Sequence, residues 1–534
     1  MRLLLPCLFW LSAFVVAADA EETARRAMVV TEHRLASEVG VDILRAGGNA
    51  VDAAVAVGYA LAVVHPCCGN LGGGGFLLLH RPGGDARFLN FRETAPAAAH
   101  AKMFLDDKGD LVPNASGLGY RAVGVPGTVL GLETAREKYG RLPRARVLAP
   151  AIRLAAEGFV LAEADLRPLK VATRLKDSPA AAKIFLRGDG EPLRAGDSLV
   201  QSDLARVLED ISKDGPRAFY EGRIPRAVEQ AAKAEGGVIA AEDFAHYRVE
   251  ESEPVHCAYR GYDVFSAPPP SSGGVALCEI LNILEGYDLK ALGFHTAAAL
   301  HRIIEAERRA FVDRNAFLGD PAFVRNPIER LGSKAYAAEL RSRISNERAT
   351  PSSELGPGLP LQEGRETTHY SIIDEDGVAV SVTYTINGYF GAQVMAPETG
   401  FVLNNEMDDF SARPGSPNAW GLVQGAANAV APGKRPLSSM SPTIVTRNGN
   451  VALVLGSPNG SRIISVTLQT ALNVIDYGLP LQQAVDAKRI HHQWLPDVVF
   501  AEPGALSPET QRELEAKGHS FQTLERFGAS EAIA

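Results

Sequence analysis

The pattern of apolar and polar positions predicts helices in the first part of the chain. Helical spacing over residues 32–45 ends at Gly47-Gly48. Asn49 can then cap a second, alanine-rich helix that reaches about Val64. The glycine-rich run 69–75 follows, and an apolar strand is expected directly after it, at residues 76–80.

The middle of the chain continues as helices before the pattern changes. Residues 125–245 have the spacing of helices joined by polar loops, and a long helix is expected from about Thr296 to Phe317. A Pro, Ser and Gly run at residues 268–274 interrupts the pattern between them. Residues 346–366 are polar and rich in Pro, Ser and Glu, which indicates an exposed segment without regular structure.

Strand composition begins at Thr367 and predicts a hairpin. The strands are Thr367 to Ile373 and Val378 to Thr385, with a turn at residues 374–377 between them. Pairing Ile373 with Val378 would place Thr367 opposite Tyr384 and beside Thr385. One face of the second strand would be apolar, and the other would carry small and hydroxylated side chains.

This hairpin has two interpretations. The first interpretation is purely structural, a surface hairpin that follows a loop. The other is chemical, because a cut between Glu366 and Thr367 would give Thr367 a free α-amino group with a pKa of about 7.7–8.0. That amine could accept the proton of the Thr367 hydroxyl, so one residue would supply both the nucleophile and its base.

Composition bounds the class of protein. The chain has 534 residues, of which 46% are hydrophobic, so it can bury a large core in one very large domain or in several ordinary ones. The formal net charge of −9 argues against a nucleic-acid partner, which would favour a basic surface.

The first twenty residues have the composition of a secretory signal. A short basic start precedes the apolar run from Leu3 to Val16, and a small-x-small end suggests cleavage after Ala20. The run is shorter than the roughly 20 residues of an ordinary membrane span. An uncleaved anchor is the alternative, and Cys7 matches a lipid-attachment site only loosely.

Four cysteines remain after such cleavage: Cys67, Cys68, Cys257 and Cys278. Their even number suits an oxidising compartment, but four in so long a chain do not form a disulfide framework. Buried free thiols are the expectation for the adjacent Cys67 and Cys68. The sequence contains no C-x-x-C or H-E-x-x-H spacing, so no metal site is expected.

Several motifs in order resemble the γ-glutamyltransferase family. They are GNLGGGGF, FRETAP, YRGYDVFSAPPPSSGG, FLGDP, TTHYS, VTYTING, NNEMDDFS, KRPLSSMSPT and GSPNGSR. The resemblance covers nearly all of the chain after the signal. It implies an N-terminal-nucleophile hydrolase with an α+β, four-layer αββα sandwich. It also implies one precursor that cuts itself into a large subunit, residues 21–366, and a small subunit, residues 367–534, without a metal or another cofactor.

The resemblance also implies roles for residues around the cut. Thr367 would be both the residue that cleaves after Glu366 and the catalytic nucleophile, and Thr385 would hydrogen-bond to it. The backbone N–H groups of Asn459 and Gly460 would form the oxyanion hole.

Further residues would hold the amino-acid head of the substrate. Arg92 would pair with the α-carboxylate, together with Ser438 and Ser439. Asn387 would contact the amino group. Glu406 and Asp409 would hold the α-ammonium at the other end of the pocket, so one cation and two carboxylates would suit a zwitterion.

The sequence departs from the family pattern at three places. Asn459-Gly460 stands where many relatives have Gly-Gly, and Asn tolerates the backbone conformation that this requires. Trp420, in the stretch that resembles the substrate-covering lid, replaces a Tyr of some relatives. The chain ends at residues 527–534, where relatives usually continue, and we expect this to affect stability more than chemistry.

The resemblance therefore implies a secreted, periplasmic γ-glutamyltransferase and glutathione hydrolase. It would pass the γ-glutamyl group of glutathione or a related donor to water, an amino acid or a peptide, without a nucleic-acid partner or a stable membrane anchor. A cephalosporin or glutaryl acylase of the same superfamily is the first alternative. The second is a binding protein without activity.

Overall fold

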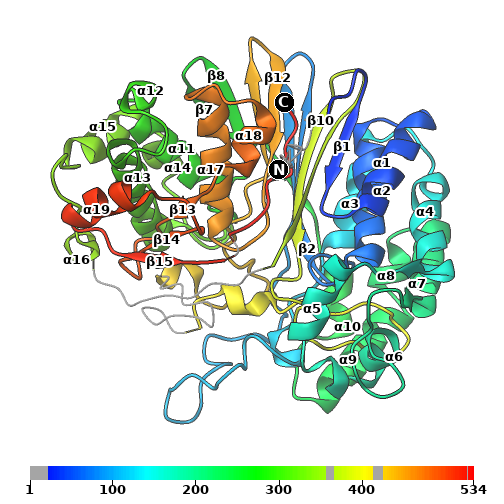
Figure 1. Ribbon diagram of the computed structural model, residues 1–534. Coiled ribbons are helices and arrows are strands. Elements are labelled where there is room, and N and C mark those ends of the chain that lie inside the picture. The colour runs from blue at the N-terminus through cyan, green and yellow to red at the C-terminus, as the bar shows by residue number, and fades with distance from the viewer. Residues whose placement is uncertain (1–21, 357–365, 413–424, 526) are drawn as a thin grey trace, which may run out of the picture.

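Two β-sheets lie face to face between two layers of helices (Figure 1). The computed structural model describes residues 22–356, 366–412, 425–525 and 527–534. The expected α+β, four-layer αββα sandwich is confirmed. The predicted signal at residues 1–20 and Trp420 of the expected lid lie outside the described residues. Within the described ranges, no helix is both long enough and apolar enough to span a membrane.

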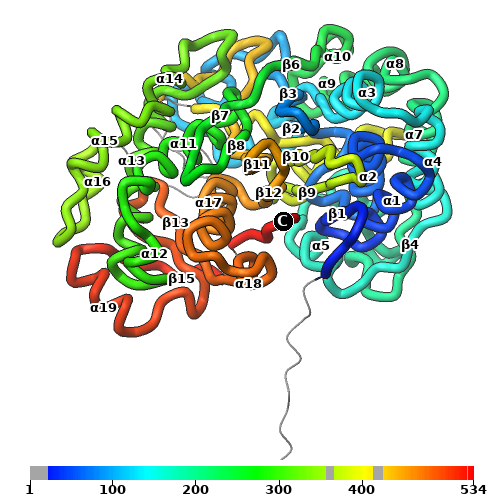
Figure 2. The backbone as a smooth tube through the Cα atoms, turned by 90° about the horizontal axis from the view of Figure 1, so that it is seen from above, coloured from blue at the N-terminus to red at the C-terminus, as the bar shows by residue number. Residues whose placement is uncertain are grey.

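The first sheet contains the predicted hairpin at its centre, with every strand antiparallel to its neighbours. Its strands, in spatial order, are β1 (Met28–Thr31), β9 (Thr368–Ile373), β10 (Ala379–Thr385), β2 (Gly74–Arg81), β3 (Asp85–Phe91) and β6 (Glu250–Ser252). The strand expected at residues 76–80 is thus present as β2. Viewed from above, the pair β9 and β10 lies between β1 and β2 (Figure 2).

The second sheet packs on the first through the faces between them. Its strands, in order, are β12 (Asn450–Leu455), β11 (Thr443–Arg447), β8 (Tyr262–Ser266) and β7 (Val255–Tyr259). Phe76 and Phe88 of the first sheet and Ile444 and Val454 of the second share one apolar cluster. The hydroxylated face of β10 is also buried here, and Ser381 donates to the carbonyl oxygen of Leu455 at 3.2 Å.

Helix α2 supports the other face of the first sheet. Every residue of α2 (Ala50–Val64) is buried, as expected for a helix that is apolar on all sides except for Asp52 in its first turn. The predicted cap is confirmed, because the Asn49 side chain accepts hydrogen bonds from Val51 N and Asp52 N. The same layer contains α1 (Arg34–Arg45), α3 (Thr128–Tyr139) and α4 (Arg144–Glu157).

The helical region expected at residues 125–245 is confirmed, with one short sheet of two strands inside it. Its further helices are α5 (Leu166–Val171), α6 (Pro179–Phe185), α7 (Ser202–Asp214), α8 (Arg217–Tyr220), α9 (Arg223–Ala234) and α10 (Ala241–His246). The small sheet pairs β4 (Phe159–Val160) with β5 (Ser198–Leu199).

The second helix layer covers the second sheet and contains the long helix predicted from Thr296. Helix α13 (Ala297–Phe317) begins after Thr296, whose hydroxyl accepts from Ala299 N at 3.2 Å. The other helices on this side are α11 (Gly273–Leu284), α12 (Leu289–Leu292), α14 (Ile328–Leu331), α15 (Lys334–Ser342), α16 (Ser352–Leu355), α17 (Arg462–Ile475), α18 (Leu481–Asp486) and α19 (Pro508–Ala516). A third sheet joins β13 (Ile490–His491), β14 (Val499–Ala501) and β15 (Phe521–Thr523).

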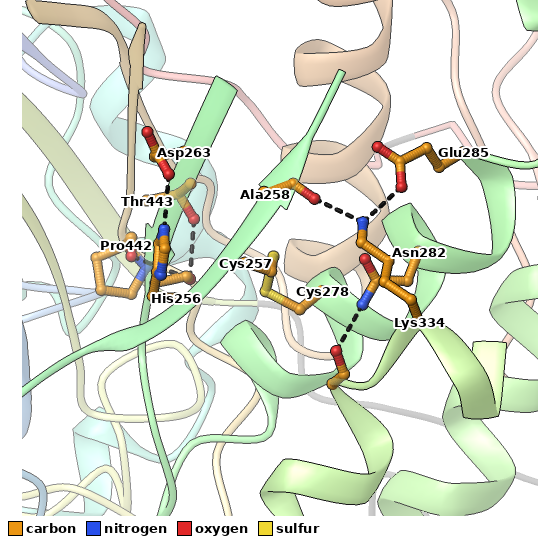
Figure 3. The surroundings of a disulfide bond; sticks show 12 residues. His256, Cys257, Ala258, Asp263, Cys278, Asn282, Glu285, Lys334, Pro442 and Thr443 are labelled. Carbon is orange, nitrogen blue, oxygen red and sulfur yellow. Dashed lines mark hydrogen bonds and ion pairs between the residues drawn. A yellow bond between two sulfur atoms is a disulfide. The ribbon is translucent and has the colours of Figure 1, made fainter. Parts of the chain in front are cut away.

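Both pairs of cysteines form disulfides, so the expectation of free thiols at Cys67 and Cys68 is wrong. These two residues lie in a turn after α2, which brings the adjacent sulfurs together. Cys257 of β7 bonds to Cys278 of α11 and ties the second sheet to its helix layer (Figure 3). Closing a loop of this length stabilises a fold by about 3 kcal/mol.

One cluster of metal-ligand types occurs in the described part of the chain. His65, Cys67 and Cys68 place their ligand atoms within 4.8 Å of one another. The two sulfurs are bonded to each other, which leaves no thiolate to ligate a metal in this state.

The segment before Thr367 is exposed at residues 346–348 and 353–354, as its composition suggested, but it is not exposed throughout. Ser352 is buried, and its hydroxyl donates to the carbonyl oxygen of Trp494. Glu366 is also buried. Tertiary contacts with the loop near Trp494 therefore override the polar composition of this segment, whose residues 357–365 lie outside the described ranges.

The last residues pack against both sheets. Ile533 exchanges two backbone hydrogen bonds of 2.9 Å with Val454 of β12. The carbonyl oxygen of Glu531 accepts from the Ser371 hydroxyl of β9 at 2.7 Å. The expected effect of this end of the chain on stability stays a prediction.

Candidate active site

The hairpin register places Thr367 directly opposite Thr385. Ile373 pairs with Ala379 and Thr368 with Tyr384, so the predicted register is wrong by one residue. The reason is the turn, because Asp374 faces Val378 and the loop between them has Gly377 at φ 78°. A three-residue loop that ends in a left-handed glycine is a common hairpin connection.

The two threonine hydroxyls are close enough to interact, as predicted. Thr367 Oγ1 donates to Thr385 Oγ1 at 3.4 Å. Thr385 Oγ1 in turn donates to the carbonyl oxygen of Glu366 at 3.1 Å and accepts from Asn387 N at 2.8 Å. One hydroxyl therefore contacts both the nucleophile candidate and the carbonyl of the peptide bond expected to be cut.

Glycines allow this end of β10 to pack against the start of β2. A Cβ atom on Gly73 would lie 2.0 Å from the carbonyl oxygen of Thr385, and one on Gly75 would lie 2.5 Å from that of Thr383. Neither distance is possible for a real side chain. The motif GNLGGGGF thus gives the strand that carries Thr385 a neighbour without side chains.

Arg92 lies just after β3 and pairs with both carboxylates that were expected to face it across the pocket. It is 1% exposed, it contacts Glu406, and its Nη2 donates to Asp409 Oδ2 at 2.5 Å. The carboxylates come from the short 3₁₀ helix η4 (Glu406–Asp409). The expectation of opposite charges at opposite ends of the pocket is therefore wrong, because the charges form one adjacent network.

Burial controls protonation in this network. Burial lowers the pKa of the Arg92 guanidinium, but the carboxylates of Glu406, Asp409 and Glu93 outweigh this and raise it. Burial raises the pKa of Glu93 to about 7, against the opposing effect of Arg92 3.7 Å away. It also raises the pKa of Glu406. Apart from its place beside Arg92, no sequence pattern singled out Glu93.

Ser438 and Ser439 lie on a loop that is fixed from the other helix layer. Ser272, at the start of α11, donates from its backbone N and from its hydroxyl to the carbonyl oxygen of Ser438, each at 2.7 Å. Arg314 of α13 donates to Ser439 Oγ at 2.8 Å and to Ser272 Oγ at 2.9 Å. Arg314 is 1% exposed, so this is a buried cation beside the two predicted serines.

The predicted oxyanion loop precedes α17 and has the left-handed backbone that was anticipated. Asn459 has φ 102° and Gly460 has φ 62°. The Asn459 side-chain oxygen accepts from Arg462 at 2.8 Å. Backbone N–H groups at the N-terminus of a helix favour negative charge, as an oxyanion site requires.

One cavity of about 430 Å³ brings nearly all of these residues together. Of the predicted site residues, the cavity lining contains Arg92, Glu366, Thr367, Thr385, Asn387, Glu406, Asp409, Ser438, Ser439 and Gly460. Asn459 lies next to Gly460 in the chain but is not part of that lining. Arg314 is part of it, and sequence reasoning missed it. Its place just before the FLGDP motif is the signal that could have found it.

Residues 36–534 match the family model of gamma-glutamyltranspeptidase. The chain belongs to this family. It is 54% identical over 507 residues to the glutathione hydrolase proenzyme of Pseudomonas sp. (strain A14), covering 95% of this chain and 88% of that protein. It is 50% identical over 512 residues to the glutathione hydrolase proenzyme of Escherichia coli (strain K12), covering 96% of this chain and 88% of that protein.

A solved structure of a cephalosporin acylase has the same fold as this γ-glutamyltranspeptidase-family chain. The protein from Bacillus halodurans superposes with a TM-score of 0.82 at 29% identity, covering 98% of this chain and 94% of that one. Both chemistries named in the sequence analysis thus occur among relatives, with higher identity on the glutathione hydrolase side.

Proposed function

We propose that this protein is a γ-glutamyltransferase and glutathione hydrolase that matures by cutting itself between Glu366 and Thr367. The observation that carries the proposal is the position of the Thr385 hydroxyl between the Thr367 hydroxyl and the Glu366 carbonyl oxygen. The family membership and the identity to two glutathione hydrolase proenzymes support it.

Maturation needs the Thr367 hydroxyl to attack the preceding carbonyl. As Thr367 Oγ1 bonds to the Glu366 carbonyl carbon, the hydrogen bond from Thr385 stabilises the negative charge that develops on the carbonyl oxygen. Expulsion of the Thr367 nitrogen, which takes up a proton, leaves an ester. Water then cleaves the ester, which gives Glu366 a carboxylate and restores the Thr367 hydroxyl.

The mature site would use the amine that this cut creates. The α-amine of Thr367 takes the hydroxyl proton while Oγ1 attacks the γ-amide carbon of the donor. The amine or peptide of the donor leaves with a proton, and a γ-glutamyl ester remains on Thr367. Water or the amino group of an acceptor then attacks the ester and regenerates the hydroxyl. Gly460 and Asn459 supply backbone donors for the oxyanion of both steps.

The charged network suits the head of a γ-glutamyl donor. The α-ammonium would lie against Glu406, Asp409 and Asn387. The α-carboxylate would lie against Arg92, Ser438 and Ser439. Glu406 and Asp409 pair with Arg92 in the structure, so binding of a donor would exchange one set of ion pairs for another.

An acylase that accepts glutaryl or cephalosporin side chains is the second candidate, favoured by the superposition on the Bacillus halodurans enzyme. The carboxylates of Glu406, which is buried, and Asp409, which is partly exposed, line the cavity and argue against it, since a glutaryl group has no ammonium. We further propose export through residues 1–20 and a periplasmic location.

The decisive experiment combines two measurements on purified protein. N-terminal sequencing of the small fragment should start at Thr367. The same sample should hydrolyse γ-glutamyl p-nitroanilide and release glutamate from glutathione. A single uncut chain without either activity would leave the binding-protein alternative.

A further inference from the structure

The disulfide between Cys67 and Cys68 lies just after α2. It contacts residues 387–390, a segment called the active-site loop below, through a backbone hydrogen bond to Phe390. Because the two cysteines are adjacent, their bond closes a small ring that contains the peptide group between them. The carbonyl oxygen of that peptide group accepts a hydrogen bond of 2.8 Å from Phe390 N. The conformation of the ring therefore sets the position of a hydrogen-bond acceptor for the segment around Phe390.

That segment continues directly into the candidate active site. Phe390 has φ 56°, and Asn387, three residues before it, has φ 72°. Asn387 N donates to Thr385 Oγ1 at 2.8 Å, and its side chain donates to the carbonyl oxygen of Asn405 at 3.0 Å. Two residues in a sparsely populated backbone region need support from their surroundings, and the Cys67 carbonyl gives part of it.

Cys67 also borders a second, smaller cavity that is separate from the catalytic one. The lining includes His65, Cys67, Phe185 and Phe390, together with the carboxylate of Asp165, which lies 3.5 Å from His33. His65 Nε2 is 3.6 Å from Cys67 Sγ. An imidazole at that distance can stabilise Cys67 Sγ when it becomes a thiolate, and Cys67 is part of the wall of this cavity.

We propose that the Cys67–Cys68 disulfide is a thiol-exchange site through which small thiols lower the activity of the enzyme. A thiolate attacks Cys67 Sγ and forms a mixed disulfide, while Cys68 leaves as a thiolate and takes up a proton. A second thiol then attacks the mixed disulfide and releases Cys67 as a thiol. In total, two thiols are oxidised to one disulfide, and the protein disulfide is reduced to two cysteines.

The inference rests on the proposed function for the source of the thiol. Hydrolysis of glutathione at its γ-glutamyl bond releases a cysteinyl dipeptide, which is itself a thiol. Accumulated product would open the ring, release the peptide group that Phe390 contacts and loosen the loop that carries Asn387. The exchange site would thus make the enzyme sensitive to its own product.

The chemical half of the proposal can be measured without any assay of activity. The protein is incubated with millimolar cysteinylglycine or dithiothreitol, alkylated, digested and analysed by mass spectrometry. We expect alkylation at Cys67 and Cys68 and an intact disulfide between Cys257 and Cys278. The second pair is an internal control, because it is buried like the first but joins β7 to α11 and is not part of the lining of the second cavity (Figure 3). An unreacted Cys67–Cys68 bond in folded protein would overturn the proposal.

The functional half compares wild type with the double variant Cys67→Ala, Cys68→Ala. Dithiothreitol has no amine and cannot act as a γ-glutamyl acceptor. In its presence we expect kcat of the wild type on γ-glutamyl p-nitroanilide to fall by about threefold to a hundredfold, the range expected for small misplacements in an active site. The rate should fall to that of the double variant, which dithiothreitol should leave unchanged.

Two further outcomes would contradict the coupling. If Cys67 and Cys68 are alkylated in full while kcat and KM of the wild type stay unchanged, the ring does not support the active-site loop. If the wild type loses activity in dithiothreitol and the variant Cys257→Ala, Cys278→Ala does not, the loss comes from the other disulfide. Thermal melting of each variant separates a local effect from unfolding.

Discussion

The side-chain hydroxyl of Thr385 donates a hydrogen bond of 3.1 Å to the carbonyl oxygen of Glu366. The same oxygen atom of Thr385 accepts from the Thr367 hydroxyl. This arrangement places one hydroxyl where it can orient the attacking group and polarise the bond under attack. It suggests two separate tests, one of the nucleophile and one of its partner.

Thr367→Ala should remain one chain and should be inactive, because no hydroxyl is left to attack the Glu366 carbonyl. Thr367→Ser is the matched control and should still cut itself, although more slowly. Denaturing gel electrophoresis over a day of incubation would show both results. If Thr367→Ala still splits at the same bond, another protease makes the cut and the nucleophile assignment fails.

Thr385→Val should slow both maturation and turnover. The change keeps the side-chain volume nearly constant but removes the donor to Glu366 and the acceptor for Asn387 N. We expect kcat to fall about tenfold to a hundredfold, with a smaller change in KM. Thr385→Ser should recover most of the rate. Wild-type kinetics in Thr385→Val would show that the position of this hydroxyl has no part in the reaction.

γ-Glutamyl p-nitroanilide should be a better donor than glutaryl p-nitroanilide, which lacks the ammonium group. Glu406 and Asp409 would gain no cation from the glutaryl compound, although Arg92 already compensates part of their charge. A lost hydrogen bond to a charged group costs about 1.5–3 kcal/mol. We therefore expect kcat/KM to differ by about tenfold to a hundredfold.

The variant Glu406→Gln tests the cause of that difference. It should narrow the ratio between the two donors, mainly by slowing the γ-glutamyl compound. Equal rates on both donors in the wild type would favour the acylase alternative over the transferase.

Arg314→Lys should weaken the binding of donors that have an α-carboxylate. Arg314 fixes Ser439 and adds a buried positive charge to the lining of the catalytic cavity. Lysine keeps the charge, but its single ammonium group cannot reproduce the planar arrangement in which two guanidinium nitrogens donate to Ser439 and Ser272. We expect KM for γ-glutamyl p-nitroanilide to rise about tenfold, with a smaller change in kcat.

Two controls separate this effect from general damage. 4-Aminobutyryl p-nitroanilide has no α-carboxylate, so its slower hydrolysis should be the same in wild type and Arg314→Lys. Arg309→Lys changes a buried arginine of the same helix that pairs with Glu305 and should leave the KM for both donors unchanged. An equal loss on both donors would mean that Arg314 does not act through the carboxylate.

The buried carboxyl of Glu307 should make stability depend on pH. Burial raises its pKa from 4.5 to about 8. The folded chain then keeps a proton that the unfolded chain releases, so this contribution to stability is complete below pH 4.5 and is lost as the pH rises to about 8. The slope is at most about 1.4 kcal/mol per pH unit. Glu307→Gln should therefore lose less stability than the wild type between pH 5 and pH 8 in denaturant titrations.

Glu305, two residues earlier on α13, provides a control of opposite sign. Burial would raise its pKa, but Arg309 and Arg308 outweigh this and lower it. Its contribution is present at neutral pH and is lost as the pH falls through that lowered value. Glu305→Gln should thus differ from the wild type most at neutral pH and least in acid. Parallel curves for wild type and Glu307→Gln would contradict the assignment.

Local signals in the sequence predicted the parts of the fold that depend on neighbouring residues. Asn49 and Thr296 act as helix caps as expected, because capping involves a side chain and backbone groups two or three residues away. The hairpin was predicted with an error of one residue, since composition alone does not show whether Val378 belongs to the strand or faces Asp374 across the turn.

Contacts between distant segments could not be predicted in the same way. Arg92 is 314 residues from Glu406 in the sequence. The two residues pair because the fold brings their loops together beside the first sheet. Arg314 contacts Ser439 across 125 residues, from a helix whose pattern gave no sign of function. The family resemblance supplied most candidate residues, but it did not show that Arg92 pairs with Glu406 or that Arg314 contacts Ser439.

The order of strands in the first sheet decides whether folding or cleavage of the precursor comes first. Strands β9 and β10 follow Thr367 in the chain, yet they lie between β1 and β2, which precede it. A cut at Glu366–Thr367 thus yields two polypeptides that share one hydrogen-bonded sheet, and neither has a complete sheet of its own. The bond to be cut reaches its geometry only when this sheet exists. The whole precursor must therefore fold before the peptide bond is cut, so that only correctly folded chains are cleaved.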